Sequence, residues 1–383
     1  MKNRLPLLLA FSFYLLLLVP PSAAQTLSDS AFASVITCGE GNEYYLSWGH
    51  SALRICDTVR GIDYAYNYGT FDFDTPHFYW KFSCGDLNYC LSRTSFDRFL
   101  QEYIFEGRAV WEQRLRLSPQ EVKNLFLLLE TNYLPEYRYY KYDFFRDNCA
   151  TRVRDMVAAC LNHRTLSPEV ATPDAKTYRY YLYEPTEGTR LWWRLGVDIT
   201  LGLRCDHPCT NYEAMFSPIV MMHTFDTMRV SDTRQPVAVP ATQILPDVRE
   251  PLSPSLPPTL VFWGVFALVA VLTLLELKKG WRLTALDRTL YIVTALISIL
   301  IIFLWFFTSH YCTKFNLNIL WASPLFIYFA IRTHKSNRWV VWAQVLMLFA
   351  TIVLCFLPYP QRINIALCPV ALTLALRLLS SKK

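Results

Sequence analysis

The sequence is poor in charged residues. Asp, Glu, Lys and Arg together make up 18% of its 383 residues, whereas 53% are hydrophobic. A typical soluble domain carries about 25% charged residues, so an ordinary soluble protein is excluded and membrane segments are expected. Intrinsic disorder is excluded for most of the chain as well, because aromatic residues reach 15% and can supply a large core.

The first two thirds of the chain lack an excess of positive charge. Residues 1–258 contain 25 Lys and Arg against 29 Asp and Glu, whereas residues 259–383 contain 12 against 2. The part large enough to fold in water is therefore slightly acidic, and it has no run of basic residues that could neutralise phosphates. A nucleic-acid partner is not expected.

The N-terminus has the pattern of a secretory signal. Lys2 and Arg4 precede an apolar stretch from Leu5 to Val19, and the small residues 22–24 come before Gln25. This pattern predicts a signal peptide over residues 1–24 that is cleaved, with an uncleaved membrane anchor as the alternative. No cysteine stands at the cleavage point after the apolar stretch, so the protein is not expected to be a lipoprotein itself.

The remaining chain divides into three parts. Residues 25–234 have mixed composition and form the expected water-soluble domain. Residues 235–258 contain seven prolines, which favour an extended, semi-rigid linker. Residues 259–383 form the expected helical transmembrane domain, because they contain apolar segments about as long as a bilayer span. We expect five spans, at Leu260–Leu277, Thr289–Thr308, Leu317–Ile331, Val340–Leu357 and Ile363–Leu379.

The basic residues of this tail indicate its orientation. Ten of its Lys and Arg residues fall in the loops between spans one and two and between spans three and four, and in the C-terminal tail. The opposite loops carry only Lys314 and Arg362. Because cytoplasmic loops are enriched in basic residues, the C-terminus is expected in the cytoplasm and the soluble domain outside it.

Eight of the eleven cysteines lie in the soluble domain, where an extracytoplasmic location permits disulfides. Their pairing cannot be read from the sequence. Cys205 and Cys209 flank His207 and could suggest a metal site, but no second Cys/His pair with suitable spacing accompanies them. A local disulfide or two unrelated thiols is the preferred interpretation, and neither a metal nor a cofactor is expected.

Two segments near the start of the soluble domain predict a β-hairpin. Residues 43–56 and 61–68 are rich in β-branched and aromatic residues, and residues 57–61 have turn character. A turn centred between Thr58 and Val59 would place Asn67 opposite His50 and Asp63 opposite Arg54. Cross-strand neighbours are close enough for Asn67 to orient the imidazole of His50. A slip of one residue would bring a tyrosine there instead.

Two helices are expected further on. Ser118-Pro-Gln-Glu121 is a capping box with proline at the first helical position. Apolar residues at helical spacing also follow Asp147-Asn148-Cys149, so either Asp147 or Asn148 is expected as the N-cap and Cys149 in the first turn.

A thiol in this position faces free backbone N–H groups and the positive end of the helix dipole, both of which favour the thiolate. The same N–H groups could stabilise an oxyanion. His50 follows a glycine at a strand start, so it is the histidine best placed to act as a base. The residues alone leave a second interpretation open, in which Cys149 is a buried apolar residue or half of a disulfide and His50 is structural.

Five motifs of the soluble domain occur in the order found in one known family. They are Trp48–Ile55, Tyr66–Phe73, Glu112–Leu115, Tyr142–Phe145 and Asp147–Asp155. This succession resembles the periplasmic domain of the lipoprotein N-acyltransferases called Lnb. The likeness covers roughly residues 30–230, and the signal peptide and multi-span tail fit the same architecture.

More distantly, the histidine strand before the cysteine helix is similar to the permuted papain-like fold of lecithin:retinol acyltransferase and its relatives. The resemblance implies an α+β fold, with a permuted papain-like periplasmic domain followed by a helical transmembrane domain of about five spans. It also implies Cys149 as nucleophile and His50 as base. Asn67 as the third member rests on the hairpin geometry alone. Supporting or substrate-positioning roles are expected for Asn148, Tyr68 and Asp72.

The resemblance further implies a thiol-dependent acyl transfer. An acyl chain would pass from a membrane phospholipid to Cys149, and from there to the α-amino group of a diacylglyceryl-cysteine lipoprotein, giving a triacylated lipoprotein. The enzyme would lie in the inner membrane with its catalytic domain in the periplasm. The aromatic pair Trp192-Trp193 could border the acyl groove, although core packing is the preferred role.

Two other functions remain open at this point. A cysteine amidase or peptidase acting on cell-wall peptides would use the same fold and the same residues, but it would need at most one membrane anchor. A binding or scaffold protein with an inactive domain would tolerate replacement of Cys149 by alanine.

Overall fold

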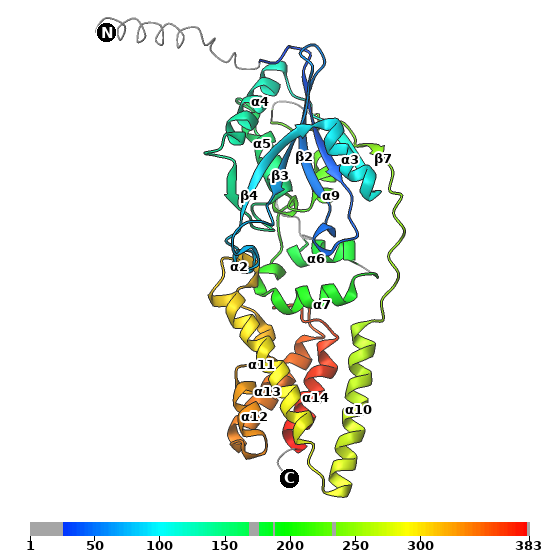
Figure 1. Cartoon of the computed structure of the whole chain (residues 1–383), viewed down its shortest axis with the longest axis vertical. Helices are drawn as coiled ribbons and strands as arrows, with labels where there is room; N and C mark the ends of the chain where they lie inside the picture. The colour runs from blue at the N-terminus through cyan, green and yellow to red at the C-terminus, as the bar shows by residue number, and fades with distance from the viewer. Residues whose placement is uncertain (1–25, 168–175, 187, 232–234, 381–383) are drawn as a thin grey trace, which may run out of the picture.

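A computed structural model describes residues 26–167, 176–186, 188–231 and 235–380. The expected signal peptide lies outside these residues. Figure 1 shows a sheet domain at one end of an elongated molecule and a bundle of helices at the other, with α7 (Leu191–Thr200) between them. In Figure 1 the last helix, α14 (Leu367–Ser380), ends on the side of the bundle that is remote from the sheet, near the turn between α10 (Pro258–Lys279) and α11 (Thr284–Phe306).

The sheet has seven antiparallel strands in the order β6-β4-β3-β2-β1-β5-β7. The strands are β1 (Phe32–Cys38), β2 (His50–Asp57), β3 (Ile62–Thr70), β4 (Asn88–Ser95), β5 (Val110–Arg114), β6 (Tyr139–Lys141) and β7 (Thr242–Leu245). The expected hairpin is confirmed as β2 and β3. Residues 43–49 are not part of it, because Tyr44–Leu46 form a 3-10 turn and β2 starts only at His50.

The register of this hairpin differs by two residues from the expected one. Arg54 pairs with Ala65 rather than with Asp63, and Asp63 pairs with Cys56. Side chains alternate between the two faces of a sheet, so a shift of two residues leaves each side chain on its expected face. Arg54 therefore still reaches the carboxylate of Asp63 diagonally, with an N–O distance of 2.7 Å.

Helices cover both faces of the sheet. One face packs against α4 (Pro119–Tyr133), α5 (Cys149–Cys160) and α9 (Pro218–Phe225), around the buried residues Leu53, Leu125 and Val153. The other face packs against α3 (Phe96–Glu106) around Phe99 and Ala52. The remaining helices of this domain are α2 (Phe78–Cys84), α6 (Tyr178–Tyr183) and α8 (Asn211–Ala214).

The expected capping box of α4 is confirmed. The Ser118 hydroxyl accepts a hydrogen bond from the Glu121 backbone N–H, and the Glu121 carboxylate accepts one from the Ser118 N–H. Glu121 also pairs with Arg164, so the cap is tied to the loop that follows α5. The local sequence thus fixes where α4 begins.

The proline-rich segment 235–258 is more than a linker. Its first part is bound to the sheet domain, since Val237 and Ala238 are completely buried and β7 pairs with β5. Only the stretch between β7 and α10 is extended without strand pairing, and most of its residues are exposed. The segment therefore supplies an edge strand before it leads to the helical bundle.

The bundle contains α10 (Pro258–Lys279), α11 (Thr284–Phe306), α12 (Leu325–Arg332), α13 (Arg338–Leu354) and α14 (Leu367–Ser380). Among the described residues, α10 and α11 are long and apolar enough to cross a membrane, whereas α13 and α14 are apolar but shorter. The third expected span is not one continuous helix. It is divided into a 3-10 turn (Leu317–Leu320) and the eight-residue α12, which at 1.5 Å per residue is too short to span a bilayer.

Candidate active site

Cys149 occupies the first turn of α5, as the sequence predicts. Its position is fixed by Asn148, the N-cap, whose side-chain oxygen accepts a hydrogen bond from the Thr151 N–H at 2.9 Å. The amide nitrogen of Asn148 donates to the carbonyl oxygens of Phe144 and Phe216, both at 2.8 Å. Asn148 therefore ties the start of α5 to the two segments beside it.

His50 is the first residue of β2, and a tight backbone turn sets its place. The residue before it, Gly49, has a φ of +75°, and a Cβ there would lie 2.5 Å from the carbonyl oxygen of Cys38. Only glycine fits this position, because other residues rarely adopt this φ and the space is already filled. The turn brings the imidazole to the end of the sheet, next to the start of α5.

Asn67 holds the imidazole from the neighbouring strand. The His50 Nε2–H donates to the Asn67 side-chain oxygen at 2.5 Å. Gly69, two residues further along β3, has a φ of +93°, a conformation that favours glycine. It lies against the pair, because a Cβ there would be in van der Waals contact with the Cys149 Cβ at 3.6 Å and with a His50 ring carbon at 3.8 Å. The structure therefore brings Cys149, His50 and Asn67 together.

The electrostatics of the pair favour the ionised forms. Burial by itself opposes a thiolate, but the charge of His50 and its hydrogen bond to the sulfur outweigh burial and lower the pKa of Cys149. The backbone N–H groups of Ser51 and Ala150 donate to the sulfur and act in the same direction. Conversely, burial disfavours a charged imidazole, yet the charge of Cys149 and the hydrogen bonds to Cys149 and Asn67 raise the pKa of His50. The site can thus hold a thiolate beside an imidazolium, the form in which a cysteine is nucleophilic.

One of these donors was not identified from the sequence. The first-turn N–H of Ala150 follows from the helix start, but the N–H of Ser51 reaches the same sulfur only because β2 begins beside α5. Two N–H groups on one side of a nucleophile are suited to bind the oxyanion that forms when a carbonyl is attacked.

The pair lies in the wall of a cavity of about 830 Å³, within the usual range for small-molecule sites. Many of its lining residues are aromatic, among them Phe71, Tyr89, Tyr142, Phe144 and Trp193. Trp193 therefore borders the cavity, whereas its neighbour Trp192 packs against Phe262 of α10. A largely apolar cavity beside a nucleophile suits a substrate with a hydrocarbon portion.

The cavity reaches the helical bundle, which the sequence did not indicate. Residues 310–313, which follow α11, line it together with Val197 and Leu201 from the end of α7. The two halves of the chain thus enclose one space. No sequence signal distinguishes these residues from other loop residues of the tail, because their role depends on how the bundle docks onto the sheet domain.

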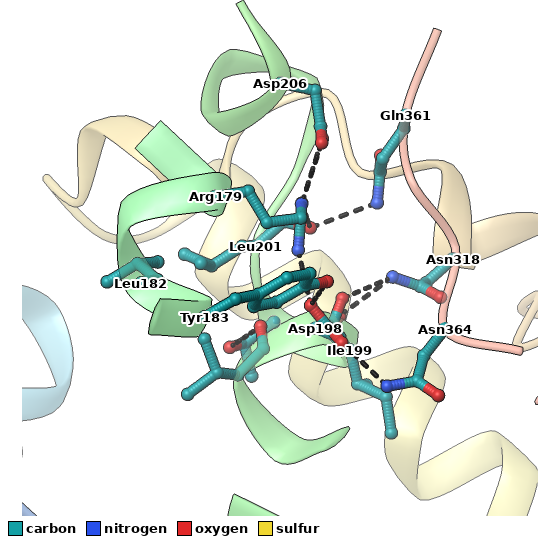
Figure 2. A network of polar contacts seen from close by, with 12 residues as sticks. Arg179, Leu182, Tyr183, Asp198, Ile199, Leu201, Asp206, Asn318, Gln361 and Asn364 are labelled. Atoms are coloured by element: carbon teal, nitrogen blue, oxygen red, sulfur yellow. Dashed lines mark hydrogen bonds and ion pairs between the residues drawn. The ribbon is translucent and has the colours of Figure 1, made fainter. Parts of the chain in front are cut away.

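A buried polar network holds that docking in place (Figure 2). Arg179 of α6, 1% exposed, pairs with Asp198 at 2.8 Å and with Asp206 at 2.8 Å. The other oxygen of Asp198 accepts a hydrogen bond from Asn364 of the bundle at 2.7 Å, and its backbone carbonyl accepts one from Asn318. Because the same aspartate binds both halves of the molecule, α7 is fixed between them, and α7 forms part of the cavity wall.

The supporting residues expected from the sequence differ in their surroundings. Asn148 borders the cavity and caps α5. Tyr68 is buried under the site against Tyr140 and Arg152, and it does not line the cavity. Asp72 is exposed and also lies outside the cavity lining, and its carboxylate accepts a hydrogen bond from the Asp74 N–H in a turn. The structure therefore gives no support to a substrate-positioning role for Asp72.

The cysteines of the described structure are all free thiols. Cys205 and Cys209 are buried in an aromatic cluster around Phe216. In the part of the chain that the structure describes, no group of three His, Cys, Asp or Glu residues could hold a metal ion.

Two family models match the chain. The Lnb N-terminal periplasmic domain matches residues 21–184, and the Lnb transmembrane domain matches residues 250–382. Together they cover more than three quarters of the chain. No curated protein and no solved structure matches it. The sheet domain is therefore periplasmic and the helical bundle is a transmembrane domain, which places the protein in the inner membrane.

Proposed function

Because the chain belongs to the Lnb family, whose periplasmic and transmembrane domains it carries in order, we propose that it is a lipoprotein N-acyltransferase. The observation that carries the proposal is the position of Cys149 beside His50 in the wall of an aromatic cavity that the transmembrane domain helps to enclose. A donor held in the membrane can thereby reach the nucleophile. A strand histidine that precedes a first-turn cysteine also suits a permuted papain-like fold.

In the first half of the reaction, His50 takes the thiol proton and the Cys149 thiolate attacks an ester carbonyl of a phospholipid. The N–H groups of Ser51 and Ala150 stabilise the resulting oxyanion. The carbon–oxygen ester bond breaks, His50 returns the proton to the leaving alkoxide, and a lysophospholipid departs. The acyl chain is left on the enzyme as a thioester. Asn67 keeps the imidazole oriented through both proton transfers.

In the second half, the free α-amino group of a diacylglyceryl-cysteine lipoprotein attacks the thioester. A carbon–nitrogen bond forms as the carbon–sulfur bond breaks, and His50 accepts the proton that the amine loses. The products are a triacylated lipoprotein and the free Cys149–His50 pair. A thioester suits this step because it is reactive toward amines, whereas the product amide is too stable to reverse readily. The C-terminus of the transmembrane domain would lie in the cytoplasm, where its basic loops are favoured.

Mass spectrometry of a lipoprotein's N-terminal peptide tests the proposal. Cells lacking the protein would be complemented with the wild type, with Cys149→Ser or with Cys90→Ser. Cys90 is a matched control, because it is a half-buried thiol on β4 that does not line the cavity. We expect the third acyl chain with the wild type and with Cys90→Ser, and its absence with Cys149→Ser at equal protein level.

Triacylation that persists in the deletion strain would refute the acyltransferase proposal, and cell-wall peptides would become the next substrates to test. Triacylation that requires the protein but tolerates Cys149→Ser would refute the role of Cys149.

A further inference from the structure

The short helix α2 exposes an unusual set of large aromatic side chains. Tyr79, Trp80 and Phe82 are 79%, 63% and 53% exposed, although a seven-residue helix on a soluble domain would ordinarily turn such residues inward. Only Phe78 of this helix is buried. Contiguous exposed apolar surface of this kind marks a site of contact with a protein or a membrane.

The position of α2 distinguishes between these two possibilities. Its C-terminal end is bound to the chain that leaves α11. Ser309 donates from its backbone N–H to Cys84 O at 2.9 Å and from its hydroxyl to Gly85 O at 2.7 Å. The His310 ring donates to Ser83 O at 3.1 Å. The Ser309 hydroxyl also donates to Cys84 O at 3.1 Å, so four hydrogen bonds fix α2 to the periplasmic end of a membrane span.

A ring contact extends this attachment down the span itself. The centroids of the Trp80 and Phe303 rings lie 5.6 Å apart, and Phe303 belongs to the last turn of α11. Figure 1 shows α2 beside the upper end of α11, at the junction of the two domains. Trp and Tyr side chains are favoured at the level of lipid headgroups, because each has an apolar ring that can face the lipid and a polar group that can face water. The exposed rings of α2 lie beside the end of α11 that faces the periplasmic domain.

The same aromatic surface continues into the active-site cavity. Phe82 of α2 and Phe73 of the preceding turn are both exposed, and both line the cavity that contains Cys149. His310 and Tyr311, which follow α11, line it from the side of the bundle. An apolar route therefore runs from the surface of α2 to the nucleophile.

We propose that α2 lies in the outer leaflet of the bilayer and that a phospholipid acyl chain enters the cavity between Phe82 and the segment after α11. The bilayer contact stands on the structure of α2 and α11 alone. The identity of the entering chain as the acyl donor rests on the proposed function.

Photo-crosslinking tests the bilayer contact. The full-length protein would carry benzoylphenylalanine at position 79 or 80, or at position 105 as control, in vesicles of phosphatidylethanolamine and phosphatidylglycerol. Phe105 is a matched control, because it is 93% exposed on α3, away from the bundle. We expect at least tenfold more phospholipid adduct at positions 79 and 80 than at position 105. The same difference is expected in a Cys149→Ala background, because the bilayer contact does not depend on the acyl transfer. Adduct levels at 79 and 80 no higher than at 105, or adducts with protein only, would overturn the bilayer contact.

Phe82→Asp tests the entry route. Two rates would be measured on Cys149, acylation by vesicle phospholipid and alkylation by iodoacetamide, a small water-soluble probe. We expect the ratio of acylation to alkylation to fall at least tenfold, because a carboxylate at the entrance repels an acyl chain but not a small polar reagent. An unchanged ratio of acylation to alkylation would overturn the route. This holds even if Phe82→Asp lowers both rates, because an equal fall in the two rates does not single out the acyl chain. If the wild type forms no acyl-enzyme, the proposed function fails while the crosslinking result still stands.

Discussion

Replacement of Asn148 by alanine provides a direct test of how the nucleophile is positioned. The Asn148 side chain is 3% exposed and makes three hydrogen bonds, one to the Thr151 N–H and two to the carbonyl oxygens of Phe144 and Phe216. Alanine removes all three. It leaves the first turn of α5 without a cap and two backbone carbonyls without this donor.

The cost can be worked out bond by bond. Loss of an N-cap destabilises a helix by about 1 kcal/mol. Each buried acceptor that loses its partner costs roughly 1–2 kcal/mol, so Asn148→Ala should destabilise the periplasmic domain by about 3–5 kcal/mol. Serine retains a capping oxygen but cannot reach the two carbonyls, and Asn148→Ser should therefore recover only about 1 kcal/mol of this loss.

Thermal unfolding followed by tryptophan fluorescence measures the effect, with the exposed Asn88→Ala as control. For a domain of this size, the alanine variant should unfold roughly 10 °C below the wild type, and the serine variant a few degrees above the alanine variant. Alkylation of Cys149 should also shift to higher pH, because the first-turn N–H groups lose their alignment. An alanine variant that unfolds at the temperature of the Asn88 control would refute this account of the site.

Three further predictions follow from the ionised groups. Alkylation of Cys149 should proceed below the pH range of an ordinary thiol, because His50 lowers its pKa. In the His50→Ala variant, the charge of His50 no longer opposes the effect of burial on the Cys149 thiol, so the pH profile of Cys149 alkylation should move to higher pH. A profile that stays in place would contradict the pairing of Cys149 with His50. Asp198→Ala leaves Arg179 with Asp206 as its one carboxylate partner and should lower the unfolding temperature by several degrees, since breaking a buried pair costs about 3–5 kcal/mol. Arg377→Met leaves two buried carboxylates of α10 and α11 without their cation, so the yield of folded protein in detergent should fall, and unchanged yield would contradict a structural role.

Local sequence determined the parts of the site that depend on neighbouring residues. Ser118 and the pair Asp147-Asn148 predict where α4 and α5 begin, because N-caps act through hydrogen bonds that span only three residues. The structure then selects Asn148 over Asp147 as the cap of α5. Cys149 in a first turn followed directly. The faces of the hairpin were also predicted, and they survived an error of two residues in the register because side chains alternate with period two.

Long-range packing decided the rest. The apolar segment 317–331 reads as a span, yet its first part is used to dock on α7 through Asn318, and only α12 remains helical. Composition cannot distinguish these roles, because an apolar residue buried against protein resembles one buried in lipid. Likewise, nothing local marks residues 310–313 as cavity lining or the α2 rings as neighbours of α11. Both depend on contacts between segments more than 200 residues apart, which arise only when the transmembrane domain closes against the periplasmic domain.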